Sequence, residues 1–172
     1  MSTYKPSDDG VTHINIHSEG KTELGRRLDN LSKEPFKHPD YGSFNSVEGL
    51  YWYLVTNREV EEFRHLFGHA VRKASIAYMD EPRHTNGRLV EEATRASQYK
   101  VLSNDSLKTL LIESTLPLTC YCYWGSSNNP KTRPAKAHQN HAAHFEILRR
   151  YLKAVEDSDR QFFHDILNPS EQ

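Results

Sequence analysis

Residues 46–56 read SVEGLYWYLVT, a strongly apolar stretch around which the rest of the fold is expected to pack. Apolar residues recur at helical spacing from Val47 to Leu54, which predicts a helix with a buried inner face. Ser46 is a favoured N-cap residue, so the helix should begin there and end near Thr56. The other segments of the chain have to complete a core around this helix.

Helical periodicity and short alternating runs continue on both sides of this stretch. Asn57 and Asn104 are candidate N-caps, and Gly68 interrupts a helical pattern. The chain should therefore form a helix-rich α+β single domain with a small β-sheet at 12–167, between flexible tails at 1–11 and 168–172. We expect further helices from Asn57 to the break at Gly68 and at 70–77, 88–102, 104–113 and 137–155, strands at 12–16 and 115–123, and loops at 18–43 and 124–134.

Composition excludes several classes of protein. The 172 residues suit one domain, and 22 Lys and Arg against 23 Asp and Glu give no global charge that would attract nucleic acid or membrane. No stretch approaches the roughly 18 apolar residues that a membrane span needs. Cys120 and Cys122 alternate on a predicted strand, where a bridge between them is rarely feasible. We therefore expect reduced thiols and a cytoplasmic protein without a membrane partner.

Glu48 is the first candidate for chemistry. It lies in the first turn of the predicted helix, where the helix dipole favours a carboxylate, although acids are also common there without any function. Ser46, Tyr51 and Trp52 bring hydroxyl groups and an indole to the same stretch. An aromatic patch beside one acid suits a planar base that is stacked next to a sugar carbon.

Two further clusters carry aromatic and imidazole groups. Tyr123-Trp124-Gly125 follows the predicted strand at 115–123, although aromatic residues at a strand end are ordinary core material. His138, His141 and His144 begin the last helix at i, i+3, i+6, whereas helical zinc pairs usually take i, i+4. We therefore expect no metal, and a hydrogen-bonding role for His141 beside a pocket.

Two basic residues could bind the phosphate groups of a ligand. Lys73 follows the break at Gly68 and could be a solvated charge, a phosphate contact or a Schiff-base amine. Arg26 follows Gly25 and could bind a diphosphate through two hydrogen bonds, or only solvate its loop.

Together these motifs resemble those of the NADAR (YbiA-like) family, over roughly residues 13–155 and in the family's order. The most specific part runs from Asn30 to Glu48. The segment 68–73 is similar to the family's "G-x-x-A-K", and 123–125 to its "YWG". The resemblance rests on Thr22-Glu23-Leu24-Gly25-Arg26, Leu28-Asp29-Asn30-Leu31, Pro35-Phe36, Phe44-Asn45-Ser46-Val47-Glu48-Gly49, Gly68 to Lys73, Tyr123-Trp124-Gly125 and Ile147-Leu148-Arg149.

The resemblance implies a compact helix-rich α+β domain with a pocket for ADP-ribose-like or ribosyl-nucleobase ligands. Family activities are hydrolyses of N-glycosidic bonds, either of reactive riboflavin-pathway intermediates or of ADP-ribose on modified guanine in DNA. Some members belong to phage, and this sequence looks most like those. The chain departs from the family pattern at Asp29, Leu31, Val55 and Tyr121, where members often carry Ser, Phe, Lys and an acid.

The sequence therefore predicts an N-glycosidase without a cofactor, in which Glu48 stabilises an oxocarbenium-like transition state or activates water. Lys73 is the second catalytic candidate. The alternatives are a protein that binds an ADP-ribose-type nucleotide without turnover, and a small helical adaptor without a ligand. If the substrate is ADP-ribosylated DNA, the protein should bind it through local contacts, because the chain has no net positive charge. The expected ligand-binding residues are Arg26, Asn30, Ser46, Trp52, Tyr123, Trp124, Gly125 and His141.

Overall fold

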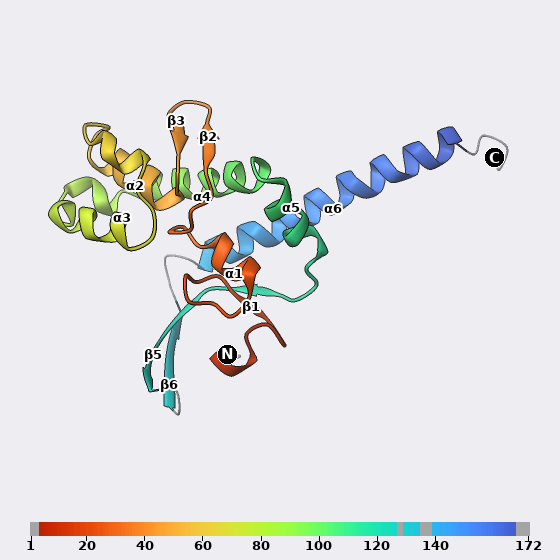
Figure 1. The fold of residues 1–172 in the computed structure, drawn as a ribbon, viewed down its shortest axis with the longest axis horizontal. Coiled ribbons are helices and arrows are strands. Elements are labelled where there is room, and N and C mark those ends of the chain that lie inside the picture. Colours follow the sequence, from red (N-terminus) through yellow and green to blue (C-terminus); the bar gives the residue numbers. More distant parts are fainter. Residues whose placement is uncertain (1–3, 127–128, 135–138, 168–172) are drawn as a thin grey trace.

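The computed structural model describes residues 4–126, 129–134 and 139–167. Helices dominate this part of the chain, so the predicted helix-rich α+β architecture is confirmed (Figure 1). The strands form three separate pairs, whereas the sequence predicted one small sheet. The helices are α1 (Glu23–Leu28), α2 (Val47–Val55), α3 (Gly68–Ser75), α4 (Gly87–Leu102), α5 (Asp105–Glu113) and α6 (Gln139–Leu167), with short 3-10 turns at η1 (Pro6–Asp8), η2 (Glu61–Arg64), η3 (Ile76–Tyr78) and η4 (Pro82–Thr85).

The strand pairs differ in direction. β1 (Ile14–Asn15) pairs in parallel with β4 (Leu118–Thr119), so two segments far apart in sequence lie side by side. The other two pairs are antiparallel hairpins. They consist of β2 (Phe36–His38) with β3 (Gly42–Phe44), and β5 (Tyr121–Ser126) with β6 (Asn129–Pro134).

The helix that the sequence places at 46–56 forms as α2 and organises the first of two apolar clusters. The Ser46 hydroxyl accepts a hydrogen bond from the Gly49 amide at 3.0 Å, as expected of an N-cap. Phe44 and Phe63 pack against this helix from the hairpin and from η2, and both are almost fully buried. The cluster comprises Leu31, Phe36, Phe44, Val47, Leu50, Trp52, Tyr53, Leu54, Val55, Phe63, Val71, Ala93 and Ala96.

The second apolar cluster lies around the first part of α6. Phe145 of α6 is fully buried among residues from α1, α5 and the β1–β4 pair. α4 joins the two clusters, because Ala93 and Ala96 belong to the first and Val101 to the second. The remaining members of the second cluster are Ile14, Ile16, Leu24, Leu28, Leu107, Leu111, Leu118, Ala142, Leu148 and Leu152.

Two predicted loops contain regular structure, so both predictions were wrong. Segment 18–43 holds α1, which is capped by the Thr22 hydroxyl, and most of the β2–β3 hairpin. Segment 124–134 contributes to the β5–β6 hairpin. In each case the elements are too short for periodicity to reveal, and Gly and Pro residues suggested turns.

The region after α2 also differs from the prediction. Asn57 and Arg58 have positive φ angles of 55° and 68°, so the chain turns there and forms only the short η2. Gly68, with φ 56°, begins α3 and does not break a helix. A left-handed residue can end one helix or precede the next, and the sequence does not distinguish these positions.

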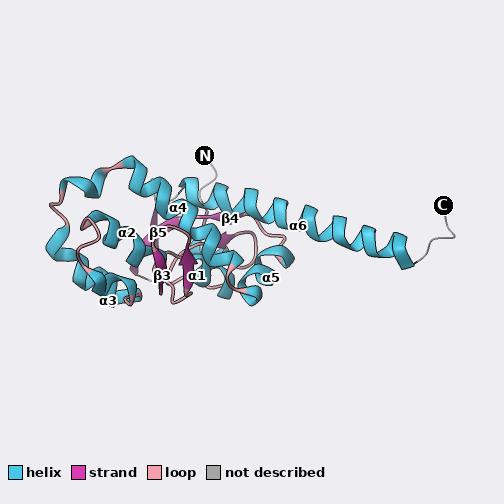
Figure 2. Ribbon diagram, turned by 90° about the horizontal axis from the view of Figure 1, so that it is seen from above, coloured by secondary structure: helices cyan, strands magenta, loops and turns pink. Residues whose placement is uncertain are grey.

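The ends of the chain differ as well. The expected N-terminal tail holds η1, and the buried Asp9 carboxylate accepts hydrogen bonds from the amides of Asn15 and Lys21. α6 is longer than the predicted helix at 137–155 and projects well beyond the rest of the molecule (Figure 2). The predicted tail at 168–172 lies outside the described residues.

Among the described residues, the helices lack the combination of length and hydrophobicity that a membrane crossing requires.

Candidate active site

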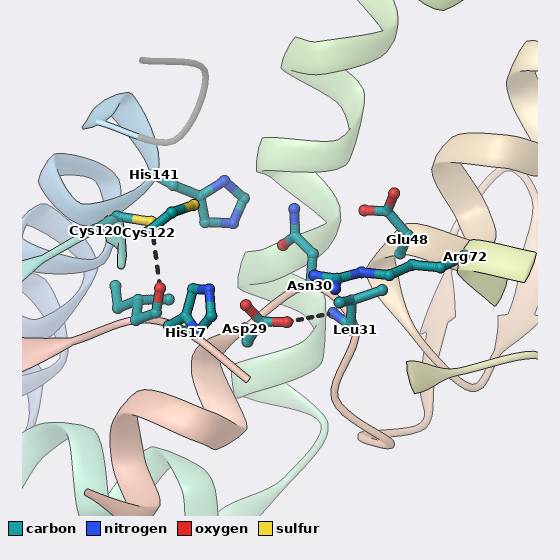
Figure 3. A pocket seen from close by; sticks show the side chains of 10 residues that line it. His17, Asp29, Asn30, Leu31, Glu48, Arg72, Cys120, Cys122 and His141 are labelled. Carbon is teal, nitrogen blue, oxygen red and sulfur yellow. Dashed lines mark hydrogen bonds between the residues drawn. The ribbon is translucent and has the colours of Figure 1, made fainter. Parts of the chain in front are cut away.

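A cavity of about 140 Å³ opens between the two apolar clusters. Its walls come from segments that are distant in sequence: the end of β1, the loop after α1, the first turn of α2, α3, the β4–β5 segment and the start of α6 (Figure 3). The site is therefore assembled by the tertiary fold. It is lined by Ile16, His17, Asp29, Asn30, Leu31, Glu48, Arg72, Cys120, Cys122 and His141.

All three residues of the loop 29–31 line this cavity. The carbonyl oxygen of Asn30 accepts a hydrogen bond from the Glu48 amide at 3.0 Å. The carbonyl oxygen of Leu31 accepts one from the Gly68 amide at 2.8 Å, and the Asp29 carboxylate accepts one from the Leu31 amide at 2.8 Å. One short loop thus fixes the first turns of both α2 and α3.

Asn30 also offers a hydrogen-bond acceptor. Its side-chain Oδ1 is buried and has no hydrogen-bond partner among the described residues. Buried polar atoms are usually satisfied, so an acceptor left over beside a cavity suits a ligand N–H or O–H group.

The Glu48 carboxylate is held in a defined orientation. The indole Nε1 of Trp52, one helical turn later, donates a hydrogen bond of 2.9 Å to Oε1 of Glu48. The Trp52 ring is buried and stacks on His84, with centroids 4.8 Å apart and an interplanar angle of 19°. Trp52 therefore orients the acid and does not line the cavity, whereas the sequence predicted that it would stack on a bound base.

Tyr51 lies next to this pair and stays a neutral donor. Burial raises the pKa of its hydroxyl, and the negative charge of Glu48 raises it further. The hydroxyl donates to the carbonyl oxygen of His84 at 2.6 Å. The same hydroxyl lies 3.0 Å from the ring Nδ1 of His84, so Tyr51 helps to hold the ring on which Trp52 stacks.

Replacing Trp52 with Phe should test this support. The ring and most of its packing remain, but Glu48 loses a charge-assisted hydrogen bond that is worth roughly 1.5–3 kcal/mol. We expect a decrease of about that size in the free energy of unfolding, measured by urea denaturation. Phe67→Leu, at a half-exposed aromatic residue, is the control and should change the stability far less.

The opposite wall carries imidazole and thiol groups. His141 is buried, and its Nε2 lies 2.7 Å from the Ser97 hydroxyl on α4. The Cys120 thiol donates to the Ile16 carbonyl at 3.2 Å, and burial raises its pKa to about 12, so it stays protonated. Cys120 and Cys122 are both unbridged, as the sequence predicted.

The structure brings only some of the predicted site residues together. Glu48, Asn30 and His141 line one cavity. Ser46 is buried and serves as the cap of α2, and its hydroxyl also donates to the carbonyl of Leu66. These two contacts give the Ser46 side chain a structural role, and it does not line the cavity.

Two predicted basic contacts do not line the cavity. Arg26 is exposed, and its guanidinium donates to the carbonyls of Gly20 and Lys21. Lys73 is exposed, while Arg72, one residue earlier on α3, reaches the cavity. Tyr123, Trp124 and Gly125 lie on β5, and their side chains are outside the described part of the structure.

The cavity is also lined by residues that were not predicted as site residues, among them Asp29, His17, Arg72 and Cys122. Asp29 had a usable signal, because it directly precedes Asn30 in the specific part of the resemblance. Arg72 differs from Lys73 by one position, and only the rotation of about 100° per helical residue decides between them. His17 and Cys122 carry no local signal.

Among the described residues, a group that could hold a metal ion lies elsewhere, at the turn of the β2–β3 hairpin. His38, Asp40 and Glu92 place their candidate ligand atoms within 4.8 Å of one another. His38 Nε2 already lies 2.8 Å from a Glu92 oxygen, and its Nδ1 accepts a hydrogen bond from the Asp40 amide. These contacts explain the cluster as a hydrogen-bonded tie between the hairpin and α4.

Comparisons of the chain with protein-family models, curated proteins and solved structures found no match.

Proposed function

We propose that the protein hydrolyses the N-glycosidic bond of an ADP-ribose-type or ribosyl-nucleobase substrate. The observation that carries the proposal is the Glu48 carboxylate, which lines the cavity and is oriented by the Trp52 indole at 2.9 Å. A fixed carboxylate can stabilise the positive charge that develops at C1 of a ribose when the base leaves. Asn30 and Asp29 add groups that can accept hydrogen bonds from sugar hydroxyls.

The size of the cavity limits which part of such a substrate enters. A cavity of roughly 150 Å³ is known to hold a single benzene-sized ring. With about 140 Å³, this one suits one ribose or one base, not a whole dinucleotide. The ribose that carries the scissile bond would sit beside Glu48, and the diphosphate would extend past the exposed Arg72.

The reaction consumes only the substrate and one water molecule. The bond between C1 and the base nitrogen breaks, and its electron pair leaves with the nitrogen. A water oxygen adds to C1, the Glu48 carboxylate accepts the proton that this water loses, and that proton ends on the departing base. The products are a free hydroxyl at C1 and a protonated base nitrogen.

Arg72 and Lys73 form a matched pair for testing the binding part of the proposal. Arg72→Ala removes a guanidinium from the cavity and should weaken ADP-ribose binding at least tenfold, since a charge-assisted contact is worth about 1.5–3 kcal/mol. Lys73→Ala removes an adjacent exposed charge and should change the affinity less than about threefold, as surface charges contribute little. Calorimetric titration measures both. Equal losses for the two variants would contradict the proposed placement of the diphosphate.

A further inference from the structure

Lys100 is a buried charged group that the proposed reaction does not use. It lies near the end of α4, and its side chain is fully buried. Its ammonium donates to three backbone carbonyl oxygens, those of Arg27 at 3.0 Å, Leu28 at 2.9 Å and Asp29 at 3.0 Å. Lysine is almost never fully buried without partners, so these carbonyls are what hold it there.

The three carbonyls lie at the C-terminal end of α1, and those of Arg27 and Asp29 also accept hydrogen bonds from the Ser32 hydroxyl. Arg27 and Leu28 are the last residues of α1, and their carbonyls have no partner within the helix. The C-terminal end of a helix also carries partial negative charge, which favours a cation. An ammonium group has three N–H donors, one for each carbonyl. Lys100, which belongs to α4, therefore caps the C-terminal end of α1.

The loop 29–31 connects the Lys100 ammonium with the cavity. Asp29 accepts from Lys100, Asn30 accepts from the Glu48 amide, and Leu31 accepts from the Gly68 amide. These are three consecutive carbonyl groups. They connect Lys100 with the first turns of α2 and α3. Glu48 lies in that first turn of α2, and Arg72 lies in the last turn of α3.

We propose that Lys100 is the positioning residue of this cavity: its ammonium group holds loop 29–31 in the conformation that binds the ligand. Lys100 does not line the cavity. The proposal rests on the proposed function only in its choice of ligand, because the hydrogen bonds involved belong to the protein alone.

The protonation state of Lys100 gives this arrangement a pH dependence. Burial lowers the pKa of Lys100 to about 8, the negative charges of Asp29 and Glu34 oppose the shift, and the positive charge of Arg27 adds to it. A neutral amine keeps two N–H donors, so one of the three hydrogen bonds from Lys100 to these carbonyls is lost. The loop should loosen, and the cavity should bind more weakly, as the pH rises through about 8.

Calorimetric titration of ADP-ribose at about pH 7 and about pH 9.5 tests this, on either side of the pKa of Lys100. Wild type should lose roughly tenfold in affinity between the two, as expected when about one pKa unit of interaction is withdrawn. Lys100→Met should bind roughly tenfold more weakly at both pH values, without that change. Lys108→Met, at the partly exposed lysine paired with Asp105 on α5, should follow wild type.

Hydrogen exchange separates this proposal from the proposed function. At the higher pH, and in Lys100→Met, the amides of Glu48 and Gly68 should lose protection once intrinsic exchange rates are corrected for, while the amide of Phe145 on α6 keeps it. That result without ADP-ribose binding by wild type would refute the ligand but support the role of Lys100. Unchanged protection and affinity across the pH range in wild type would overturn the proposal, even if Lys100→Met failed to fold.

Discussion

Glu48→Gln should reduce turnover on the order of 10²–10⁴-fold, the range expected for loss of a catalytic acid–base group. Gln keeps the shape of the side chain and can still accept a hydrogen bond from the Trp52 indole at Oε1. It cannot stabilise a positive charge at C1 or accept a proton from water. The affinity for ADP-ribose should therefore stay within about threefold of wild type, well under the roughly 1.4 kcal/mol of a tenfold change.

Release of free ADP-ribose from ADP-ribosylated guanine, followed by chromatography, measures this effect. Glu91→Gln is the matched control, because Glu91 is an exposed acid on α4 that does not line the cavity. A Glu48→Gln variant that turns over at the normal rate would remove Glu48 from the mechanism. Tight binding by wild type with no product released would instead make the chain a nucleotide-binding protein.

Gly49→Ala should be among the most destabilising single substitutions. A Cβ atom at Gly49 would lie 2.4 Å from the Phe63 carbonyl oxygen and 3.1 Å from the Ser46 hydroxyl. The nearer atom belongs to the backbone, so either α2 or η2 has to move. We expect a loss of roughly 3 kcal/mol, the upper part of the range for overpacking. Because Glu48 is the preceding residue, ADP-ribose binding should weaken as well.

Gly87→Ala is the matched control for this substitution. Gly87 begins α4, and an added Cβ meets nothing within 4 Å. Alanine there should stabilise the protein by about 0.4–1 kcal/mol, because it restricts the unfolded chain. Thermal unfolding compares the two, and a loss of 3 kcal/mol corresponds to a decrease in Tm of roughly 6–12 °C. Similar Tm values for both variants would mean that α2 and η2 do not pack as closely as described.

The helices with strong caps were predictable from the sequence. α2, α4 and α5 begin after Ser46, Asn86 and Asn104, and each of these side chains accepts a hydrogen bond from an amide of its helix. In these helices the cap and the apolar periodicity indicate the same element. α6 was predicted from its periodicity too, but its length was underestimated because polar and charged residues follow Val155 from 156 to 161.

The hairpins were not predictable because their stability comes from pairing across the chain. Phe36 and Phe44 face each other on β2 and β3, with ring centroids 6.0 Å apart, and each strand is too short to show alternation. The β1–β4 pair joins residues more than a hundred positions apart, from Ile14 to Leu118. Local patterns carry no information on such contacts.

The candidate site was predictable where one residue supplies its own signal. Glu48 stood out by its position in a helical first turn beside aromatic residues, and Asn30 by the resemblance. Lys100 was not predicted. Its partners are backbone carbonyls at the end of α1, and only the tertiary fold brings them next to this side chain of α4. Buried cations of this kind follow from the tertiary fold and have no sequence motif.

A crystal structure of Glu48→Gln with ADP-ribose would show directly whether this cavity is an N-glycosidase site. We expect the distal ribose inside the cavity, with its C1 hydroxyl within about 2.6–3.2 Å of the side chain of residue 48, the distance at which a general base reaches the attacking water. We also expect the diphosphate beside Arg72. ADP-ribose bound elsewhere on the protein, or seated with its ribose away from residue 48, would contradict the assignment of this cavity as an N-glycosidase site.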